Sequence, residues 1–368
     1  MNILQLSPYS SELTGGSQAY CFALSKMLKR RGHGVEVWTG RYPRTLSKVD
    51  YSFGFPVKRF FVASYVLQLN PAFLVTSDIL REIKRFDIIA THSYIFFSSN
   101  QLAFCRLLKR FPYVLHLHGG LGDLNPSLVG YRKFVMKRFY DKTVGKLTLR
   151  GADRIISVCQ ADADYVMENY NVPDNKMFVI PNAVDSSLFP VAEPSCPPVA
   201  CYVGRLVPWK GTRQMPKIFN TLAENGVHVR VVGSGQEESY LKRHCTRDVE
   251  FMGYVHPSDI PRVLSDVSCL MLPSFMEGLP TVCLEAMSAG VPSVAYDVGG
   301  VRECVRDGIT GYVVAKGDVD AFIDKTLRVL ESDGFKDNCL NLSRRVYDWN
   351  VVTDKVESVY RQILNMKR

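Results

Sequence analysis

Short apolar runs alternate with longer amphipathic stretches along the whole chain. The first run, Asn2–Leu6, is followed by a glycine-containing loop and by a stretch in which Ala19, Ala23 and Met27 recur every four residues. This period places the three side chains on one face and predicts a helix. Similar apolar runs follow at Val35–Thr39, Asp87–His92, Tyr113–His118 and Arg154–Cys159. Strands that alternate with helices are typical of a parallel sheet covered on both faces.

The alternation begins again after a proline-rich segment. Residues 190–198, PVAEPSCPP, carry one charge and predict a linker. The runs VACYVG, VHVRVVG, CLMLP and PSVAY come after it. We therefore expect two doubly wound α/β domains, residues 1–189 and 199–346, whose ligands bind beyond the carboxyl ends of the strands. Residues 347–368 predict a closing helix with one apolar stripe, formed by Val352, Val356, Val359, Tyr360 and Ile363.

The net charge of +9 is concentrated in the first half of the chain. Residues 1–190 carry 24 basic and 14 acidic residues, whereas the remainder carries 21 basic and 22 acidic residues. Tyr131–Arg150 alone holds seven basic residues and one acidic residue, interleaved with aromatics. Such a segment fits either a helix that lies on an anionic membrane surface or a solvated helix whose aromatics enter the core. No nucleic-acid-binding motif accompanies it, and we expect no nucleic-acid partner.

Cysteine usage and the apolar stretches bear on the compartment. Ten cysteines are scattered from Cys21 to Cys339 without C-x-x-C pairs or metal-ligand spacing, which favours buried thiols in a reducing compartment. The N-terminal residues lack the features of a signal peptide, and the apolar stretch Phe60–Val75 is interrupted by polar residues and a proline. We expect a cytoplasmic protein, peripheral on the inner face of the membrane if the basic segment binds lipid.

The stretch Ser274–Ala295, SFMEGLPTVCLEAMSAGVPSVA, carries the strongest functional signal. Pro280 suits the first position of a helix, and Gly290 suits the position just past its end. The unpaired N–H groups of the first turn would then be free to bind an anion such as a phosphate. These groups belong to Thr281, Val282 and Cys283.

Two glutamates flank this predicted anion site. Glu277 lies on the loop before the helix, and Glu285 lies four residues after Thr281 on the same helix face. A phosphate cradle beside two carboxylates that bind hydroxyl groups suits a sugar nucleotide. The alternative is a solvated helix with two ordinary surface glutamates.

Two loops at predicted strand ends could bind phosphate. Gly15 and Gly16 open the first loop of the chain, where the absence of side chains lets N–H groups approach a phosphate. Gly204–Gly211, GRLVPWKG, places Arg205 and Lys210 on one loop, where they could neutralise a diphosphate or simply be solvated cations. A partial glycine fingerprint after a later strand, which includes Gly233, favours a tight turn over a dinucleotide site.

Three histidines lie at predicted strand ends in the first half. His118 ends a strand and precedes Gly119 and Gly120, which makes it the best catalytic candidate of the three. His116 would point to the opposite strand face from its immediate neighbours, and His92 has no glycine loop after it. We therefore expect these two histidines to be structural.

Together these features resemble the retaining glycosyltransferases of family four, which have the GT-B fold. The resemblance covers nearly the whole chain, and its most specific part is the E-x7-E unit with a GRL…KG loop before it. It also includes TGGSQAYCFALSKMLKRRGHGVEVWT, VLHLHGG, VIPNAVDSSLF, VVGSGQEESYL and GGVRECVRDGITGYVV. The resemblance implies two Rossmann-like domains facing across a cleft, the first for the acceptor and the second for the sugar nucleotide. The terminal DWNVVTDKVESVY resembles the family's last helix, which crosses back onto the first domain.

The resemblance implies a role for each candidate residue. Glu285 would hold the ribose hydroxyls and Glu277 the hydroxyls of the transferred sugar. Arg205 and Lys210 would stabilise the diphosphate, and His118 would touch the donor sugar beside the reacting carbon. Further donor-binding residues would be Gly15, Gly16, Gly204, Gly233, Tyr254, Val255, Gly278, Leu279, Pro280, Thr281 and Val282.

The implied reaction is transfer with retention by front-face attack, in which the leaving phosphate takes the acceptor's proton. Because Arg205 and Lys210 can replace a cation, we expect no metal and no other cofactor. The donor would be a UDP-sugar, with guanosine as the second candidate base, and the acceptor a glycan or lipid-linked molecule in cell-surface polysaccharide or glycolipid synthesis. In NAVD, Ala183 replaces the family's usual glycine, which leaves the role of Asn182 open. A nucleotide-sugar epimerase or hydrolase and a non-catalytic sugar-nucleotide sensor remain as alternatives.

Overall fold

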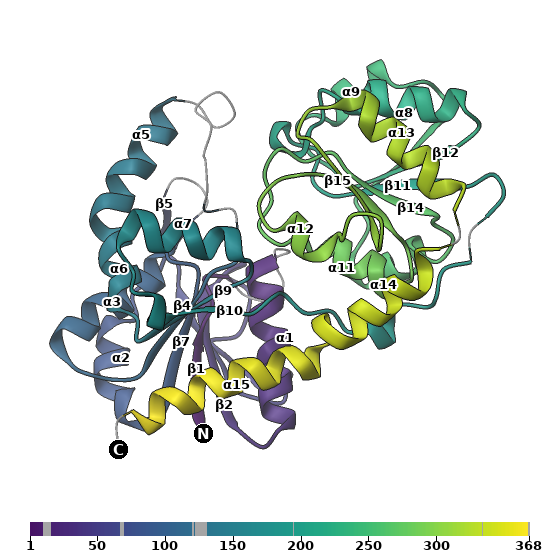
Figure 1. Cartoon of the computed structure of the whole chain (residues 1–368). Coiled ribbons are helices and arrows are strands. Elements are labelled where there is room, and N and C mark those ends of the chain that lie inside the picture. The colour runs from purple at the N-terminus through teal and green to yellow at the C-terminus, as the bar shows by residue number, and fades with distance from the viewer. Residues whose placement is uncertain are drawn as a thin grey trace. The chain divides into compact units, whose positions relative to one another are not determined.

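A computed structural model describes residues 1–9, 16–66, 70–119, 121, 131–193, 195–332 and 334–366 of the chain. The chain forms two compact units (Figure 1). The first consists of Met1–Pro181 together with Trp349–Arg368, and the second of Asn182–Asp348. Each unit is an α/β domain built around its own parallel sheet, as the alternation of apolar runs predicts.

The sheet of the first unit has the strand order β10-β9-β8-β7-β1-β2-β4-β3 among the described residues. Every neighbouring pair is parallel except β3 with β4. The strands are β1 (Asn2–Leu6), β2 (Gly34–Arg41), β3 (Val49–Asp50), β4 (Val57–Phe61), β7 (Ile88–His92), β8 (Tyr113–His116), β9 (Arg154–Ser157) and β10 (Met177–Val179). A separate antiparallel pair is formed by β5 (Ser64–Val66) and β6 (Asn70–Ala72).

Helices cover both faces of this sheet (Figure 1). The chain leaves β1 in one direction along the sheet and returns to β7 on the other side, so that α1 packs with α15 and α3 packs with α2 and α6. The helices are α1 (Gly16–Arg30), α2 (Thr76–Glu82), η1 (Ile83–Arg85), α3 (Phe97–Leu108), α5 (Tyr131–Tyr140), the π-helix η2 (Asp141–Gly145), α6 (Lys146–Gly151), α7 (Gln160–Tyr170), η3 (Asp174–Lys176) and α15 (Trp349–Asn365). Leu4, Trp38, Ile89 and Leu115 belong to the buried core.

The C-terminal helix α15 belongs to the first unit, as the resemblance implies. Its predicted apolar stripe is buried throughout, from Val352 to Ile363. Arg31, just after α1, forms ion pairs with Asp354 at 2.5 Å and with Glu357 at 3.2 Å. Apolar burial and these ion pairs together fix α15 against α1.

The sheet of the second unit has the strand order β13-β12-β11-β14-β15-β16 in its described residues, and all neighbours are parallel. Its strands are β11 (Val199–Val203), β12 (His228–Val232), β13 (Val249–Gly253), β14 (Cys269–Leu272), β15 (Ser293–Tyr296) and β16 (Gly311–Val314). Its helices are η4 (Ser186–Leu188), η5 (Pro208–Lys210), α8 (Met215–Glu224), α9 (Glu238–His244), η6 (Pro257–Asp259), α10 (Ile260–Val263), α11 (Thr281–Ser288), α12 (Val301–Cys304), α13 (Val319–Leu330), α14 (Lys336–Leu342) and η7 (Ser343–Tyr347).

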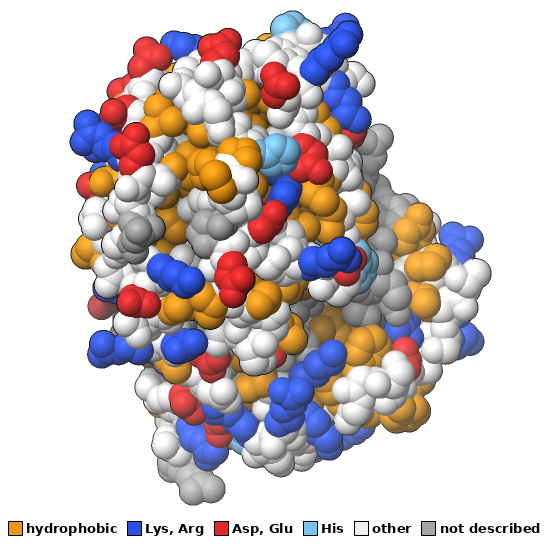
Figure 2. All heavy atoms as spheres, turned by 90° about the vertical axis from the view of Figure 1, so that its right-hand side faces the viewer, with side chains coloured by type: hydrophobic (Ala, Val, Ile, Leu, Met, Phe, Trp, Pro, Cys, Tyr) orange, Lys and Arg blue, Asp and Glu red, His pale blue; other side chains and the backbone are white. Residues whose placement is uncertain are grey.

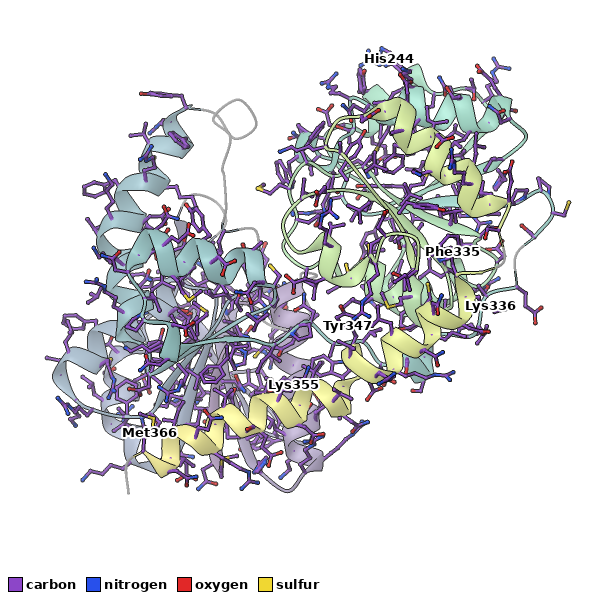
Figure 3. All side chains as sticks on the ribbon, in the orientation of Figure 1. His244, Phe335, Lys336, Tyr347, Lys355 and Met366 are labelled. Atoms are coloured by element: carbon purple, nitrogen blue, oxygen red, sulfur yellow. The ribbon has the colours of Figure 1, made fainter. Side chains whose placement is uncertain are left out.

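Ala192, within the predicted linker 190–198, is bonded to the second unit, and the division between the units lies before this segment. The N–H of Ala192 donates to the carbonyl of Ala289 at 2.7 Å, and its own carbonyl accepts from Nζ of Lys336 at 3.0 Å. The chain passes between the units at Pro181–Asn182 and again at Asp348–Trp349. Just before the second passage stands Tyr347, which is labelled in Figure 3. Its hydroxyl donates to the carbonyl of Glu303. The second passage therefore follows directly on a residue that is bonded to the second unit.

Acidic and basic side chains are interspersed over the second unit (Figure 2), in keeping with the near-balanced charge of that half of the sequence. No helix in the described ranges has the length and apolar character needed to span a bilayer.

Candidate functional site

Strand order brings two loops together in the second unit. From β11, the chain runs to β12 and β13 on one side, whereas β14 pairs with β11 on the other. In an open parallel sheet, ligands bind beyond the carboxyl ends of the strands at such a switch point. The loop after β11 contains Arg205 and Lys210, and the loop after β14 contains Glu277.

Backbone contacts hold these two loops in register. The N–H of Phe275 donates to the carbonyl of Trp209 at 2.9 Å. Gly211 has a φ of +81°, and a Cβ at this position would lie 1.9 Å from the carbonyl oxygen of Pro273. Only glycine fits this close approach. The last glycine of GRLVPWKG is therefore needed to place its neighbour Lys210 beside the Glu277 loop.

Lys210, on the loop after β11, and Glu277, on the loop after β14, form an ion pair. Nζ of Lys210 lies 2.5 Å from Oε1 of Glu277, and their side chains are 18% and 9% exposed. The lysine ammonium has three N–H groups, so that two remain for another acceptor. The Glu277 loop is fixed from behind, because the N–H of Gly300 donates to the carbonyl of Gly278 at 2.8 Å.

Helix α11 starts directly after this loop, one residue later than the sequence predicts. Pro280 is the N-cap with extended backbone, and the helix begins at Thr281. The N–H of Cys283 donates to the carbonyl of Pro280 at 3.1 Å and is not free, contrary to the prediction. No side chain caps the helix within the described residues. The N–H groups of Thr281 and Val282 remain as candidates to bind an anion.

The end of α11 is as the sequence predicts. Gly290 has a φ of +78° just past the helix. Its N–H donates to the carbonyl of Met287 at 3.0 Å, and the N–H of Val291 donates to the carbonyl of Ala286 at 2.8 Å. This pair of bonds is the Schellman motif, which satisfies the last carbonyls of the helix.

Glu285 projects from α11 on the same face as Thr281. Its carboxylate is partly buried, and among the described residues it has no ion-pair or hydrogen-bond partner. Burial raises the pKa of Glu285 to about 7. An unpartnered carboxylate on a helix can accept from hydroxyl groups, and the raised pKa makes Glu285 sensitive to pH near neutrality.

The glycine-containing turns of the second unit pack directly on one another. Gly233 has a φ of +131°, and a Cβ there would lie 1.9 Å from the carbonyl oxygen of Gly204. A Cβ on Gly204 would lie 2.9 Å from the hydroxyl of Tyr202. That hydroxyl donates to the carbonyl of Arg205 at 2.9 Å. These contacts account for both glycines by loop packing, and a role in donor binding stays a prediction.

The remaining candidates of the second unit lie at its surface or brace its loops. Arg205 is exposed, with its guanidinium 5.7 Å from the centre of the Trp209 ring. Tyr254 follows β13 and is exposed, while Val255 is partly buried. Asn182, whose role the sequence leaves open, is buried and donates from Nδ2 to the carbonyl of Leu279 at 3.1 Å. It therefore positions the turn that leads into α11.

In the first unit, His118 is the end of a chain of hydrogen-bonded side chains. Its Nε2 lies 2.9 Å from Nδ1 of His92, whose Nε2 lies 2.9 Å from Oε1 of Gln5. Nε2 of Gln5 donates to the hydroxyl of Tyr360 at 3.3 Å, and that hydroxyl lies 2.9 Å from Nε2 of His116. The sequence pattern predicts that His92 and His116 are structural and gives no link to His118, whereas the structure joins all three.

The direction of this chain follows from the amide oxygen. Because Oε1 of Gln5 can only accept, Nε2 of His92 carries the proton and its Nδ1 accepts from Nε2–H of His118. Nδ1 of His118 is then left as an acceptor. Burial lowers the pKa of His118 and of His116 to about 3 and also lowers that of His92. All three imidazoles are neutral at pH 7, and His118 acts as a hydrogen-bonding group and not as a cation.

The first glycine loop is only partly described. Gly16 is the first residue of α1 and is exposed, with open space where a Cβ would be. Gly15 lies outside the described residues. The role of both in phosphate binding stays a prediction.

Two Asp-x-Asp triplets have a spacing that could hold a cation, and each has a structural role. In the triplet at 162–164, Asp162 is buried and accepts from the N–H of Leu121 at 2.9 Å. In the triplet at 318–320, Asp318 caps α13. Across the described part of the chain, no cluster of three or more His, Cys, Asp or Glu side chains could hold a metal ion. Independence from metal stays a prediction.

The two halves of the chain match profiles of sugar-transferring enzymes. Residues 14–188 match the profile described as Glycosyltransferase Family 4, and residues 197–332 match that of Glycosyl transferases group 1. An uncharacterized glycosyltransferase of Methanocaldococcus jannaschii is 24% identical, with 97% of both chains covered. The phosphatidyl-myo-inositol mannosyltransferase of Mycobacterium leprae is 23% identical over 99% of this chain and 97% of the relative.

Solved structures with the same architecture cover the whole chain. Sucrose-phosphate synthase from Thermosynechococcus elongatus has a TM-score of 0.81 at 18% identity, with 100% of both chains covered. Anabaena HepE in complex with UDP has a TM-score of 0.74 at 20% identity, with 98% of this chain and 100% of that chain covered. These structures establish the GT-B fold, and the profiles and relatives establish the class of enzyme. The chain is a glycosyltransferase with the GT-B fold.

Proposed function

We propose that this glycosyltransferase transfers a sugar, with retention of configuration, from a UDP-sugar to a glycan or a lipid-linked acceptor. The observation that carries the proposal is the Lys210–Glu277 pair at the strand switch point, directly before the uncapped start of α11. A cation beside free N–H groups suits a diphosphate, and a carboxylate beside that cation suits sugar hydroxyls.

Within the proposed site, each group has one task. Two N–H groups of Lys210 and those at the start of α11 bind the diphosphate and stabilise the charge that develops on it as the anomeric bond breaks. Glu277 keeps its bond to Lys210 and accepts from hydroxyls of the transferred sugar. Glu285 holds the ribose hydroxyls, and Arg205 adds a second cation at the diphosphate. No divalent cation is required, because these fixed charges and the N–H groups of α11 stabilise the charge of the diphosphate in its place.

His118 acts from the first unit as a neutral acceptor through Nδ1 toward a hydroxyl of the donor sugar. Neither glutamate forms a covalent intermediate, since both serve to bind hydroxyls. The leaving phosphate takes the acceptor's proton on the face from which the acceptor attacks. This assignment keeps the E-x7-E glutamates as binding groups, in line with the family resemblance.

The donor and the acceptor are proposed from the similarity of the chain to known proteins and from the positive charge of residues 1–190. HepE, which has the same fold, is in complex with UDP, and uridine is therefore the first base to test. The acceptor named for the Mycobacterium leprae relative is phosphatidyl-myo-inositol, a lipid. The basic excess of residues 1–190 suits an acceptor that carries phosphate, as in polysaccharide or glycolipid assembly at the inner face of the membrane.

A panel of UDP- and GDP-sugars tests the proposal. The correct donor should raise the melting temperature most, because tighter binding to the folded state stabilises it more, and Glu277→Gln and Lys210→Met should lose this shift. Release of nucleotide should then depend on added acceptor lipid or glycan. Equal release without any acceptor would point to a hydrolase, and binding without turnover under any acceptor would point to a sensor.

A further inference from the structure

A cavity of about 630 Å³ opens in the first unit between the continuous helix formed by α5, η2 and α6 on one side and α7 on the other. Lys137, Arg138, Lys142 and Lys146 line one side, and Tyr165 and Asn169 of α7 line the other. Its volume is in the range of small-molecule sites. The groups proposed for sugar transfer lie elsewhere in the fold, at the ends of β7 and β8 and in the second unit.

The cations of this cavity are mostly uncompensated. Asp141 is the acidic residue of the lining, and it is already paired with Lys137 at 2.6 Å and accepts from the hydroxyl of Tyr94 at 2.8 Å. Within the described part of the chain, Arg138, Lys142 and Lys146 have no carboxylate partner. A concave site with three unpaired cations attracts an anion.

The π-helix η2 between α5 and α6 fixes the side of the cavity that carries the cations. This turn, Asp141–Gly145, keeps the helix continuous while Arg138, Lys142 and Lys146 recur every four residues. A Cβ on Gly145 would lie 3.1 Å from the ring of Tyr94. Glycine at this position therefore lets the Tyr94 ring pack closely against the helix. Extra-residue turns of this kind often occur at functional sites.

An apolar surface adjoins the cations. Tyr131 is 75% exposed and Phe139 is 73% exposed on α5, and Val135 between them is also exposed. These residues are four apart and share a helix face. Figure 1 shows α5 standing out beyond the end of the sheet of its unit. Of the two sequence-based interpretations, the core-facing one does not hold for Tyr131 and Phe139, which would occupy a membrane interface well.

We propose that this cavity binds the phosphate headgroup of an anionic membrane lipid while Tyr131 and Phe139 enter the interfacial layer. The three unpaired cations supply charge for the phosphate, and Tyr165 and Asn169 supply polar groups for the rest of the headgroup. The cavity would thereby hold the enzyme at the surface that carries lipid-linked acceptors. The inference adds a docking site to the proposed function and does not depend on which donor is used.

Vesicle sedimentation tests the docking site. The full-length protein should bind phosphatidylcholine vesicles that contain phosphatidylglycerol and should bind pure phosphatidylcholine vesicles at least tenfold more weakly. Lys142→Gln with Lys146→Gln should weaken binding to the anionic vesicles at least tenfold. The control, Lys29→Gln with Lys84→Gln, removes the same charge from exposed sites elsewhere in the unit and should stay within about twofold of wild type.

The apolar contribution is tested separately. Tyr131→Ser with Phe139→Ser should weaken vesicle binding and leave its salt dependence, whereas Tyr51→Ser, at another exposed aromatic, should have no effect. If both lysine double variants lose vesicle binding equally, the cavity is not the docking site, because the vesicles would then be attracted by the overall positive charge of the unit. Saturable binding of glycerol phosphate without any vesicle binding would overturn the lipid as occupant.

The outcome can be separated from that of the proposed function. Sugar-nucleotide binding by the lysine variants should equal that of wild type, which also shows that they are folded. Vesicle binding without binding of any sugar nucleotide would contradict the proposed donor site alone. Donor binding and turnover without preference for anionic vesicles would contradict the docking site alone.

Discussion

Nε2 of His118 lies 2.9 Å from Nδ1 of His92, and the two rings are stacked with centroids 5.1 Å apart. Tyr20 packs its ring against both. Because Oε1 of Gln5 accepts the proton of His92 Nε2, Nδ1 of His92 must accept from His118. This contact fixes Nε2 as the nitrogen of His118 that carries the proton. His92 is thus a positioning residue for the imidazole that is proposed to contact the donor sugar.

Replacing His92 should impair catalysis without removing the donor site. His92→Phe keeps an aromatic ring in the stack but leaves His118 free to change tautomer and orientation. We expect kcat to fall about tenfold, which corresponds to the loss of one hydrogen bond, while KM for the donor changes little. Steady-state kinetics would measure this, with the melting temperature as the folding control. His92→Phe that matches wild type in kcat would show that His118 needs no positioning.

Removing the Lys210 ammonium should have the largest effect of any single change. Lys210→Ala removes the cation at the leaving diphosphate and leaves Glu277 without its partner, and we expect turnover to fall by about two decades or more. Lys217→Ala is the matched control, because Lys217 pairs with Asp320 at an exposed position of the same unit. If Lys210→Ala keeps activity within about threefold of wild type, Lys210 does not act at the diphosphate.

Glu285 should make donor affinity depend on pH near neutrality. Its pKa of about 7 in the free protein lies above its ordinary value, and hydroxyl groups bind best to the carboxylate. Donor affinity should therefore fall as pH drops below 7, approaching tenfold per pH unit. UDP-glucose is the suitable probe in calorimetry, since its diphosphate does not titrate in this range. Glu285→Gln should bind more weakly with an affinity that is flat between pH 6 and 8.

The same shift has a consequence for stability, of the opposite sign. A carboxyl group whose pKa is raised by folding stabilises the protein below its unfolded pKa, and this contribution is lost as pH rises through about 7. Urea unfolding without ligand should therefore show Glu285→Gln gaining stability relative to wild type between pH 5 and pH 8. A difference between the two proteins that does not change with pH would mean that Glu285 is ionised throughout.

Activity should not need a divalent cation. Excess chelator should leave turnover unchanged, because Lys210, Arg205 and the start of α11 already face the leaving group in the proposed site. Activity that is lost in chelator and restored only by magnesium or manganese would contradict this prediction.

Asp162→Asn should lower the stability of the fold more than the activity per folded molecule, because the Asp162 carboxylate accepts from the N–H of Leu121.

The fold could be predicted because each strand is a local apolar run and each helix has its own period. Asn2–Leu6 and the buried stripe of α15 are found as predicted. The passage between the units could not be located, because prolines at 190–198 are equally compatible with a free linker and with a segment bonded to Ala289 and Lys336. Which of these holds depends on contacts distant in sequence.

Candidate site residues could be named from the sequence, but the contacts among them could not. Lys210 and Glu277 are both recognisable from their motifs, whereas their ion pair depends on the neighbouring positions of β11 and β14. His92 and His116 are register partners on adjacent strands, and only that pairing brings His92 to His118. Asn182 likewise has no local signal, because its partner is the carbonyl of Leu279.

The most direct measurement is a crystal structure with the sugar nucleotide that stabilises the protein most. We expect the diphosphate against Lys210 and the start of α11, the ribose on Glu285, and hydroxyls of the transferred sugar on Glu277. A nucleotide bound away from Lys210 and Glu277 would contradict this assignment.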